Sequence, residues 1–333
     1  MTCVIGIDEA GYGPNLGPLC IGLSLWQVPD NTNATNGARS TASPEEIDLF
    51  ELLTPMVCGK PDGRRVAIAD SKLLYKPKGG LRDLERGVLA MLAASGADSI
   101  DQWKKLVDHL HADRTQQQAE LPWMDPVYHP AVPAAVAASD LQAAADSIAE
   151  CSAATLCEMR AVMVHAREFN AACEEYASKG LALSRWSLGL LRDAIDTLPT
   201  SESTPTVIQV TCDKHGGRNN YAGLLTEFFP EYALRVIVES RPRSAYLLTS
   251  SAAELRIEFR TKGEARLETA LASMVAKYLR ELSMEAFNQY WQSHLPTLKP
   301  TAGYPLDAKR FKADIAKKQQ ELGIDDAILW RNR

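Results

Sequence analysis

Two apolar segments, far apart in the chain, each run directly into acidic residues. Residues 4–7 are followed by Asp8 and Glu9, and residues 205–212, the clearest buried strand of the sequence, are followed by Asp213. Short apolar runs bounded by turn residues are typical of buried strands. A buried carboxylate without a partner is costly, so acidic residues here belong at strand ends. The pattern therefore predicts an α/β or α+β sheet whose carboxylates gather at one edge.

Strand and helix patterns follow one another along the rest of the chain. We expect strands at residues 3–7, 19–28, 155–164, 205–212, 232–238 and 255–259. We expect helices at residues 81–92, 169–195 (one or two, separated near Gly180), 268–290 and 307–322.

Three further segments are read from composition. Residues 29–45 are polar and have too little apolar content to pack, so they are expected to form a loop. Residues 95–154 are rich in alanine and broken by prolines, which indicates a helical insertion. Residues 290–333 are expected to form a C-terminal helical extension. We predict one domain spanning residues 1–333, enlarged by these additions.

The composition excludes several classes of protein. With 46% hydrophobic and 23% charged residues the chain is neither disordered nor fibrous. The net charge of −6 argues against a protein that coats nucleic acid non-specifically, but it permits a local basic face used together with metal ions. Seven scattered cysteines indicate reduced thiols. We see no signal peptide or membrane span, and we expect a cytoplasmic location, no membrane contact and a monomer.

The pair Asp8 and Glu9 has two readings. Two adjacent acidic residues after a strand can simply point to solvent in a turn. The glycine-rich stretch that follows, Gly11-Tyr12-Gly13-Pro14 and then Gly17-Pro18, favours a functional reading. Such a stretch lets the backbone approach another molecule closely and leaves N–H groups free to meet a phosphate or sugar.

Residues 6–18 strongly resemble the opening signature of the ribonuclease HII family, in which Asp-Glu-Ala-Gly-Arg-Gly-Pro is followed by Gly-Pro. Four further matches occur in the family's order. They are Asp70-Ser71-Lys72-Leu73, similar to Asp-Ser-Lys-Lys-Leu; Asp213, similar to the third catalytic carboxylate; residues 273–281, similar to Ser-x-x-Ala-Lys-x-x-Arg-Asp and preceded by Lys262-Gly263-Glu264 in place of Lys-Gly-Asp; and Gly303-Tyr304-Pro305. The resemblance covers about half of the chain, and residues 95–154 and 221–251 have no counterpart in it.

The resemblance implies a fold, a reaction and a set of metal ligands. The fold is ribonuclease H-like, with a mixed five-stranded sheet flanked by helices. The reaction is endonucleolytic hydrolysis of the RNA strand of an RNA–DNA hybrid, or of duplex DNA at embedded ribonucleotides, leaving 5′-phosphate and 3′-hydroxyl ends. Two Mg²⁺ or Mn²⁺ ions are implied as cofactors. The residues it assigns to catalysis and metal binding are Asp8, Glu9, Asp213 and Glu281.

The resemblance also implies substrate contacts, at Gly11, Tyr12, Gly13, Asp70, Ser71, Lys72, Lys277, Arg280 and Tyr304. Plainer roles stay open for several of these residues. Asp70 can be a helix N-cap, Lys277 and Arg280 can decorate a solvated helix face, and Tyr304 can be an ordinary half-buried aromatic residue. His215 can be a proton carrier or a loop histidine without a role, and the basic residues 309–318 can grip DNA or form a solvated face.

Two departures from the family pattern leave other functions open. Tyr12 stands where the family has arginine, and Glu281 stands where it has aspartate. Glutamate can still ligate a hard cation through oxygen. One alternative is a hybrid-binding protein with impaired catalysis. The other is a ribonuclease H-like nuclease that acts on another structured nucleic acid.

Overall fold

The computed structural model describes residues 2–29, 47–75, 80–97, 100–112, 120–199 and 205–332. The loop expected at residues 29–45 falls outside the described residues except for Pro29.

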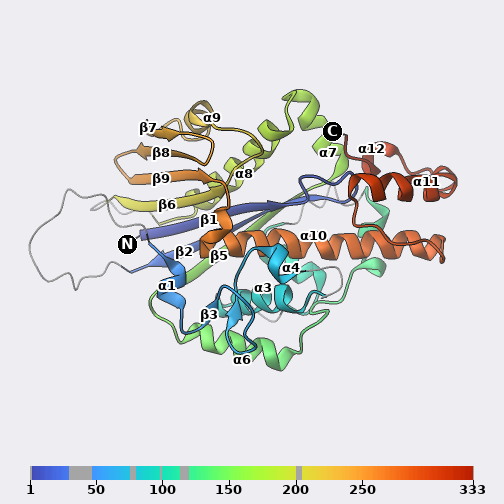
Figure 1. Cartoon of the computed structure of the whole chain (residues 1–333), viewed down its shortest axis with the longest axis horizontal. Helices are drawn as coiled ribbons and strands as arrows, with labels where there is room; N and C mark the ends of the chain where they lie inside the picture. The colour runs from blue at the N-terminus through green and yellow to red at the C-terminus, as the bar shows by residue number, and fades with distance from the viewer. Residues whose placement is uncertain are drawn as a thin grey trace, which may run out of the picture.

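A seven-stranded mixed sheet forms the centre of the molecule (Figure 1), with the strand order β5-β2-β1-β6-β9-β8-β7. The central strands β1, β6 and β9 run parallel, while β2, β5, β8 and β7 pair antiparallel with their neighbours. The bounds are β1 Thr2–Ala10, β2 Leu19–Val28, β5 Thr155–Val164, β6 Thr206–Asp213, β7 Ala233–Glu239, β8 Arg243–Thr249 and β9 Ala253–Arg260. Two short strands, β3 (Val57–Cys58) and β4 (Val66–Ala67), pair separately.

The α/β class with a mixed sheet is confirmed, but the sheet has seven strands, more than the five that the resemblance implies. The sequence pattern did not indicate β8, because Arg243–Thr249 carries only a brief apolar run. In the sheet, this strand pairs with β9 along its whole length and turns Tyr246 and Leu248 into the core. The hairpin of β7 and β8 thereby widens the sheet beyond β9.

One long helix, α10 (Leu267–His294), lies directly on the backbone of β1 and β2. A Cβ atom added at Gly6 would come within 2.1 Å of the carbonyl carbon of Glu268, and one at Gly22 within 2.2 Å of the carbonyl oxygen of Ala272. Glycine is therefore required at both strand positions. This close approach fixes the first turns of α10 beside the carboxyl end of β1.

Helices cover both faces of the sheet (Figure 1) and enclose two hydrophobic clusters. The face with α10 also carries α1 (Leu49–Leu53), α2 (Ser71–Leu74), α3 (Arg82–Ala94), α4 (Trp103–His109) and α6 (Ala138–Ala149). The other face carries α7 (Ala166–Glu175), α8 (Lys179–Asp196) and α9 (Ala222–Phe228). The helical segment expected at 169–195 is thus two helices, with the break before Gly180.

The two added regions pack against α10. Between residues 95 and 154, the described part contains α4, α6 and the 3₁₀ helices η1 (Pro122–Met124) and η2 (Pro126–Tyr128), and the ring of Trp123 lies 5.0 Å from that of Phe287. The C-terminal region contains α11 (Pro305–Glu321) and α12 (Asp326–Leu329), with Phe311 5.5 Å from the same Phe287. Among the helices formed by the described residues, none is both long enough and apolar enough to cross a membrane.

Candidate metal centre

Three carboxylates meet at the carboxyl ends of the central strands. In the parallel ladder of β1 and β6, Ile7 lies opposite Cys212, so the residues that follow them, Asp8 and Asp213, reach the same edge of the sheet. One carboxylate oxygen from each of Asp8, Glu9 and Asp213 lies within 4.8 Å of the others. The structure thus brings together three of the four carboxylates that the resemblance assigns to metal binding.

Asp8 is held in place from two sides. It is still part of the strand, paired with Gly22 of β2, and it is buried. Its Oδ1 accepts a hydrogen bond from the backbone N–H of Glu9 at 2.7 Å, and its side chain is also hydrogen-bonded by Ser273 of α10. The strand and the helix together therefore fix this carboxylate, and neither acidic residue lies in a free turn.

A fourth carboxylate, Glu264, approaches from the end of β9. This strand is parallel to β6 and leads into the 3₁₀ helix η3 (Gly263–Ala265) at the same edge of the sheet. The backbone N–H of Gly263 donates to Asp213 Oδ1 at 3.2 Å. Burial raises the pKa of Asp213, and the negative charge of Glu264 raises it further. We call these four residues the acidic cluster: Asp8, Glu9, Asp213 and Glu264.

Glu281 does not join this cluster, and the structure corrects that assignment. Its carboxylate pairs with Lys277 and accepts a hydrogen bond from Tyr75. It lies eight residues beyond Ser273 on α10, and a rise of ~1.5 Å per residue places it roughly 12 Å further along the helix. The signal that identifies Glu264 was present in the sequence, since Lys262-Gly263-Glu264 stands where the family has Lys-Gly-Asp.

The acidic cluster is electrostatically strained without a cation. Burial, and then the charges of Glu9 and Asp213, raise the pKa of Asp8 well above its usual range. Burial, followed by the charges of Asp213 and Glu264, raises the pKa of Glu9 to about 8. Burial also raises the pKa of Asp213. A hard divalent cation with oxygen ligands would remove this repulsion, so the donor set fits Mg²⁺ or Mn²⁺.

Arg280, expected to contact substrate, is buried beneath the glycine-rich loop. Its guanidinium donates to the carbonyl oxygens of Pro18 at 2.5 Å, Leu16 at 3.2 Å and Ala302 at 3.0 Å. Its side chain is nearly inaccessible. The structure therefore corrects this assignment as well: Arg280 is a positioning residue that holds the loop, because no substrate atom can reach its donors.

The glycine-rich loop is also held from the C-terminal end of the chain. Arg331 is buried and donates to the carbonyl oxygen of Gly11 at 2.6 Å. Gly11 has a φ of 86°, a left-handed backbone conformation that favours glycine. Burial, and then the charge of Arg280, lower the pKa of Arg331 to about 9. The shape of the loop thus depends on two buried arginines that lie behind it.

The Asp70-Ser71-Lys72 motif supports the cluster from α2. Asp70 is the N-cap of this helix and accepts from the backbone N–H of Lys72 at 2.9 Å. Ser71 is buried, with its Oγ 3.2 Å from that of Ser273, which in turn bonds Asp8. Lys72 is the most exposed of the three, with its side chain 80% exposed and its Nζ 3.8 Å from a carboxylate oxygen of Glu264. Of the three, Lys72 alone offers a free surface to an anionic ligand.

Tyr12 and His215 line a cavity of about 480 Å³, together with Gly217 and other residues that follow Asp213 in the chain. The ammonium of Lys179 lies 4.1 Å from the centre of the Tyr12 ring. His215 is buried, with Nδ1 3.0 Å from Ser184 Oγ, and burial lowers its pKa to about 3. The imidazole is therefore neutral at physiological pH, which favours the reading of His215 as a structural residue.

The remaining predicted contacts lie on the surface or in ion pairs. Tyr304 is 53% exposed at the start of α11. Lys277 is half-buried, paired with Glu281 and stacked over the Tyr75 ring at 4.7 Å. On the basic helix α11, Lys312 pairs with Asp326. Part of the positive charge of α11 is therefore already neutralised within the protein.

No protein-family model matches the sequence, and no curated protein matches it. Solved structures with a similar chain trace include ribonuclease H2 from Pyrococcus horikoshii OT3, at a TM-score of 0.45 and 16% identity over 98% of this chain and 92% of that one. RNase HII from Archaeoglobus fulgidus, solved in complex with PCNA, gives 0.40 and 13% over 99% and 94%. Bst-RNase HIII in complex with Mn²⁺ gives 0.36 and 13% over 99% and 66%. At these identities, the likeness assigns no role to any residue.

The raised carboxyl pKa values predict a pH dependence in metal-free protein. Because the folded pKa of Glu9, about 8, exceeds its ordinary value of 4.5, the folded protein binds more protons than the unfolded chain between these values. The contribution of Glu9 to stability is complete below its unfolded pKa of 4.5. It is lost as the pH rises through its folded pKa of about 8. Bound Mg²⁺ replaces the protons, so its stabilising effect should grow with pH. Thermal unfolding with and without Mg²⁺ at several pH values measures this, and a stabilisation by Mg²⁺ that shrinks as pH rises would contradict it.

Proposed function

We propose that this chain is a metal-dependent endonuclease that cuts the RNA strand of RNA–DNA hybrids, using two Mg²⁺ or Mn²⁺ ions held by the acidic cluster. The observation that carries the proposal is the convergence of Asp8, Glu9 and Asp213, whose ligand oxygens lie within 4.8 Å of one another. The choice of nucleic acid as substrate rests on the sequence resemblance to the ribonuclease HII family.

The residues around the acidic cluster have different proposed roles in the reaction. Two bound divalent ions would activate a water, stabilise the leaving 3′-oxygen and neutralise the scissile phosphate. Ser273 orients the carboxylate of Asp8, and the N–H of Gly263 orients that of Asp213. Lys72, exposed beside Glu264, supplies a positive charge for a backbone phosphate. The proposed products carry 5′-phosphate and 3′-hydroxyl ends.

The glycine-rich loop is proposed to recognise the ribose of the substrate. In the family that this sequence resembles, the backbone of Gly-Arg-Gly reads the 2′-hydroxyl group of the ribonucleotide. In this chain, Gly11 and Gly13 occupy the positions of the two glycines. The buried Arg280 and Arg331 hold the loop by donating hydrogen bonds to its carbonyl groups. Recognition of the 2′-hydroxyl group by backbone atoms depends on the glycines more than on the side chain of Tyr12. This supports recognition of ribonucleotides despite the substitution.

Two alternatives stay open, and one substrate panel separates them. A long RNA–DNA hybrid, a DNA duplex with one embedded ribonucleotide and a DNA junction are incubated with Mg²⁺ and either the wild-type protein or Asp8→Asn. We expect the wild-type protein to cleave the long hybrid and Asp8→Asn to leave it intact. Hybrid binding without cleavage indicates a catalytically impaired binding protein, and preference for the junction indicates a different nuclease.

The position of the fourth carboxylate can be tested by a matched pair of variants. Glu264→Gln should lower the cleavage rate about 100-fold or more, because a ligand of the metal pair contributes several kcal/mol of transition-state stabilisation. Glu281→Gln should stay within a few-fold of wild type, since it affects only the pair with Lys277 and the hydrogen bond from Tyr75, both away from the acidic cluster. Single-turnover cleavage rates at saturating Mg²⁺ make the comparison. A larger loss of cleavage rate in Glu281→Gln than in Glu264→Gln would identify Glu281 as the fourth ligand instead.

A further inference from the structure

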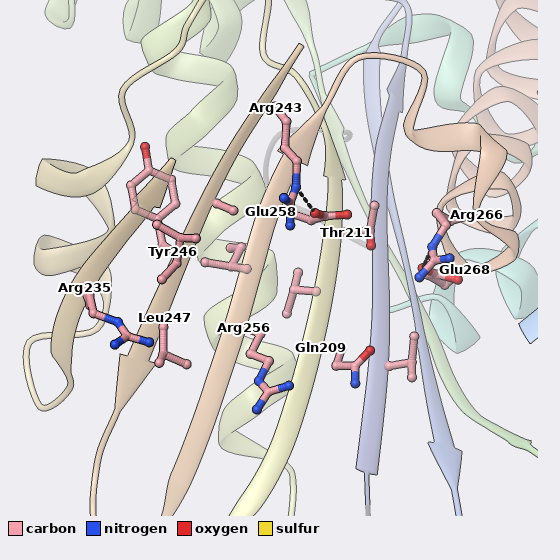
Figure 2. Close-up of a pocket in the computed structure, with 15 residues that line it drawn as sticks. Gln209, Thr211, Arg235, Arg243, Tyr246, Leu247, Arg256, Glu258, Arg266 and Glu268 are labelled. Carbon is pink, nitrogen blue, oxygen red and sulfur yellow. Dashed lines mark hydrogen bonds and ion pairs between the residues drawn. The ribbon is translucent and has the colours of Figure 1, made fainter. Parts of the chain in front are cut away.

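The sheet leaves an open face beside the acidic cluster, over β6, β9, β8 and β7. A shallow cavity of about 460 Å³ lies on it (Figure 2), lined by side chains from all four strands. Helix α10 lies over β1 and β2 and so covers a different part of the same sheet. The opposite side of the four strands packs into the core with α8 and α9. Within the part of the chain that the structure describes, the open face is therefore a surface adjoining the proposed site of cleavage.

Strand register places this face in line with the metal ligands. Side chains two residues apart on a strand share a face, so Gln209, Thr211 and Asp213 of β6 point to one side. Directly beside Asp213 stands Arg260 of β9, and beside Arg260 stands Arg243 of β8. The acidic cluster thus continues across the sheet into a row of arginines.

A second row crosses the sheet at Gln209, four residues before Asp213 on β6. It runs from Gln209 to Arg256, Leu247 and then Arg235 at the outer strand β7. Figure 2 shows these four side chains at one level on neighbouring strands. Strands ~4.8 Å apart place β7 roughly 14 Å from β6. We call the four basic residues of the two rows the arginine face: Arg235, Arg243, Arg256 and Arg260.

The charge of this face is positive although the whole protein carries a net charge of −6. Two glutamates of β9, Glu254 and Glu258, lie on the same face as the four arginines. Glu258 lies 2.7 Å from Arg243 and 3.1 Å from Arg260, and Glu254 pairs with Arg256. Arg235 is exposed and makes no hydrogen bond or ion pair with any residue in the described part of the chain. Four positive groups against two negative ones leave a net of two positive charges.

We propose that the arginine face binds the phosphate backbone of the duplex whose RNA strand is cut at the acidic cluster, an inference that rests on the proposed function. Guanidinium groups match phosphate oxygens in geometry and keep their charge at any physiological pH. The hairpin of β7 and β8 lies within residues 221–251, which have no counterpart in the family resemblance. This chain therefore carries its own additional surface for a duplex, spanning roughly four base pairs at ~3.4 Å each.

The test compares double variants of equal charge change. Arg235→Ala/Arg256→Ala removes two arginines of the open face, while Arg185→Ala/Arg192→Ala removes two from α8 on the opposite side of the sheet. Arg235→Lys/Arg256→Lys keeps the charge. Binding of a labelled RNA–DNA hybrid about two helical turns long is followed by fluorescence anisotropy between about 50 and 200 mM salt, with EDTA present to prevent cleavage.

The expected result is specific to the open face. Arg235→Ala/Arg256→Ala should weaken binding about tenfold or more at the lowest salt and reduce the slope of log K against log salt by about two. The lysine variant should recover most of the slope, and the α8 variant should bind like the wild-type protein. Unchanged binding by the first variant, or an equal loss in the α8 variant, overturns the inference. Cleavage by the wild-type protein in Mg²⁺ is scored separately, so failure of the arginine face and failure of the proposed nuclease activity are distinguishable.

Discussion

Asp213→Asn should lower the rate of hybrid cleavage by about three orders of magnitude and, at the same time, stabilise the metal-free protein. Loss of a metal ligand removes several kcal/mol from the transition state, and each ~1.4 kcal/mol is tenfold in rate. The asparagine keeps an oxygen that can accept from the N–H of Gly263. It also removes one of the charges that raise the pKa values of Asp8 and Glu9. Relief of this repulsion is the reason for the higher stability.

A matched control for this variant is Asp70→Asn. It removes one negative charge near the same site, and asparagine caps a helix as well as aspartate does. We expect near wild-type cleavage and unfolding for the control. The measurements are single-turnover rates in Mg²⁺ and thermal unfolding in EDTA. An Asp213→Asn protein that cleaves within tenfold of wild type would rule out its role as a ligand.

Arg280→Met should destabilise the protein by about 3 kcal/mol or more, because three backbone carbonyl groups lose a charged donor and each such bond contributes ~1.5–3 kcal/mol. The acceptors at Leu16 and Pro18 belong to the glycine-rich loop, so cleavage should fall together with stability. Burial lowers the pKa of Arg280, and removal of a buried charge offsets part of the loss.

Guanidinium denaturation measures the effect, and Lys277→Met on the same helix is its control. Among the residues that the structure describes, Lys277 makes a single ion pair, with Glu281, and contacts no loop carbonyl group, so the control should lose clearly less stability than Arg280→Met. If Arg280→Met unfolds like the wild-type protein but shows only a raised KM for hybrid, Arg280 contacts substrate and the positioning role assigned here is wrong.

The strand ends and their carboxylates were predictable because the chemistry is local. Buried strands are rich in apolar residues, and β5 was expected with the bounds that the structure has. The parallel pairing of β1 with β6 then brings Asp8 and Asp213 together, as acidic residues after both strands had indicated.

The choice between Glu264 and Glu281 as the fourth carboxylate depends on packing that neither sequence motif displays. The sequence motif extends from Ser273 to Glu281, but it does not say which turn of the helix meets the sheet. That is decided by Gly6 and Gly22, which seat the first turns of α10 on β1 and β2. Only the residues near Ser273 then reach the acidic cluster, and Glu264 enters from the end of β9.

The hairpin of β7 and β8 was missed in part for a similar reason. β8 gains its place by pairing with β9 along its length, a non-local interaction that is invisible in a short segment with mixed polarity. The arginines of the open face look like ordinary surface residues until the register places them in two rows beside Asp213.

Anomalous diffraction from a crystal grown with Mn²⁺ tests the metal centre most directly. We expect two Mn²⁺ peaks ~4 Å apart among the carboxylates of Asp8, Glu9, Asp213 and Glu264. Absence of Mn²⁺ from these carboxylates at saturating concentration, or a single peak beside Glu281, would contradict the account.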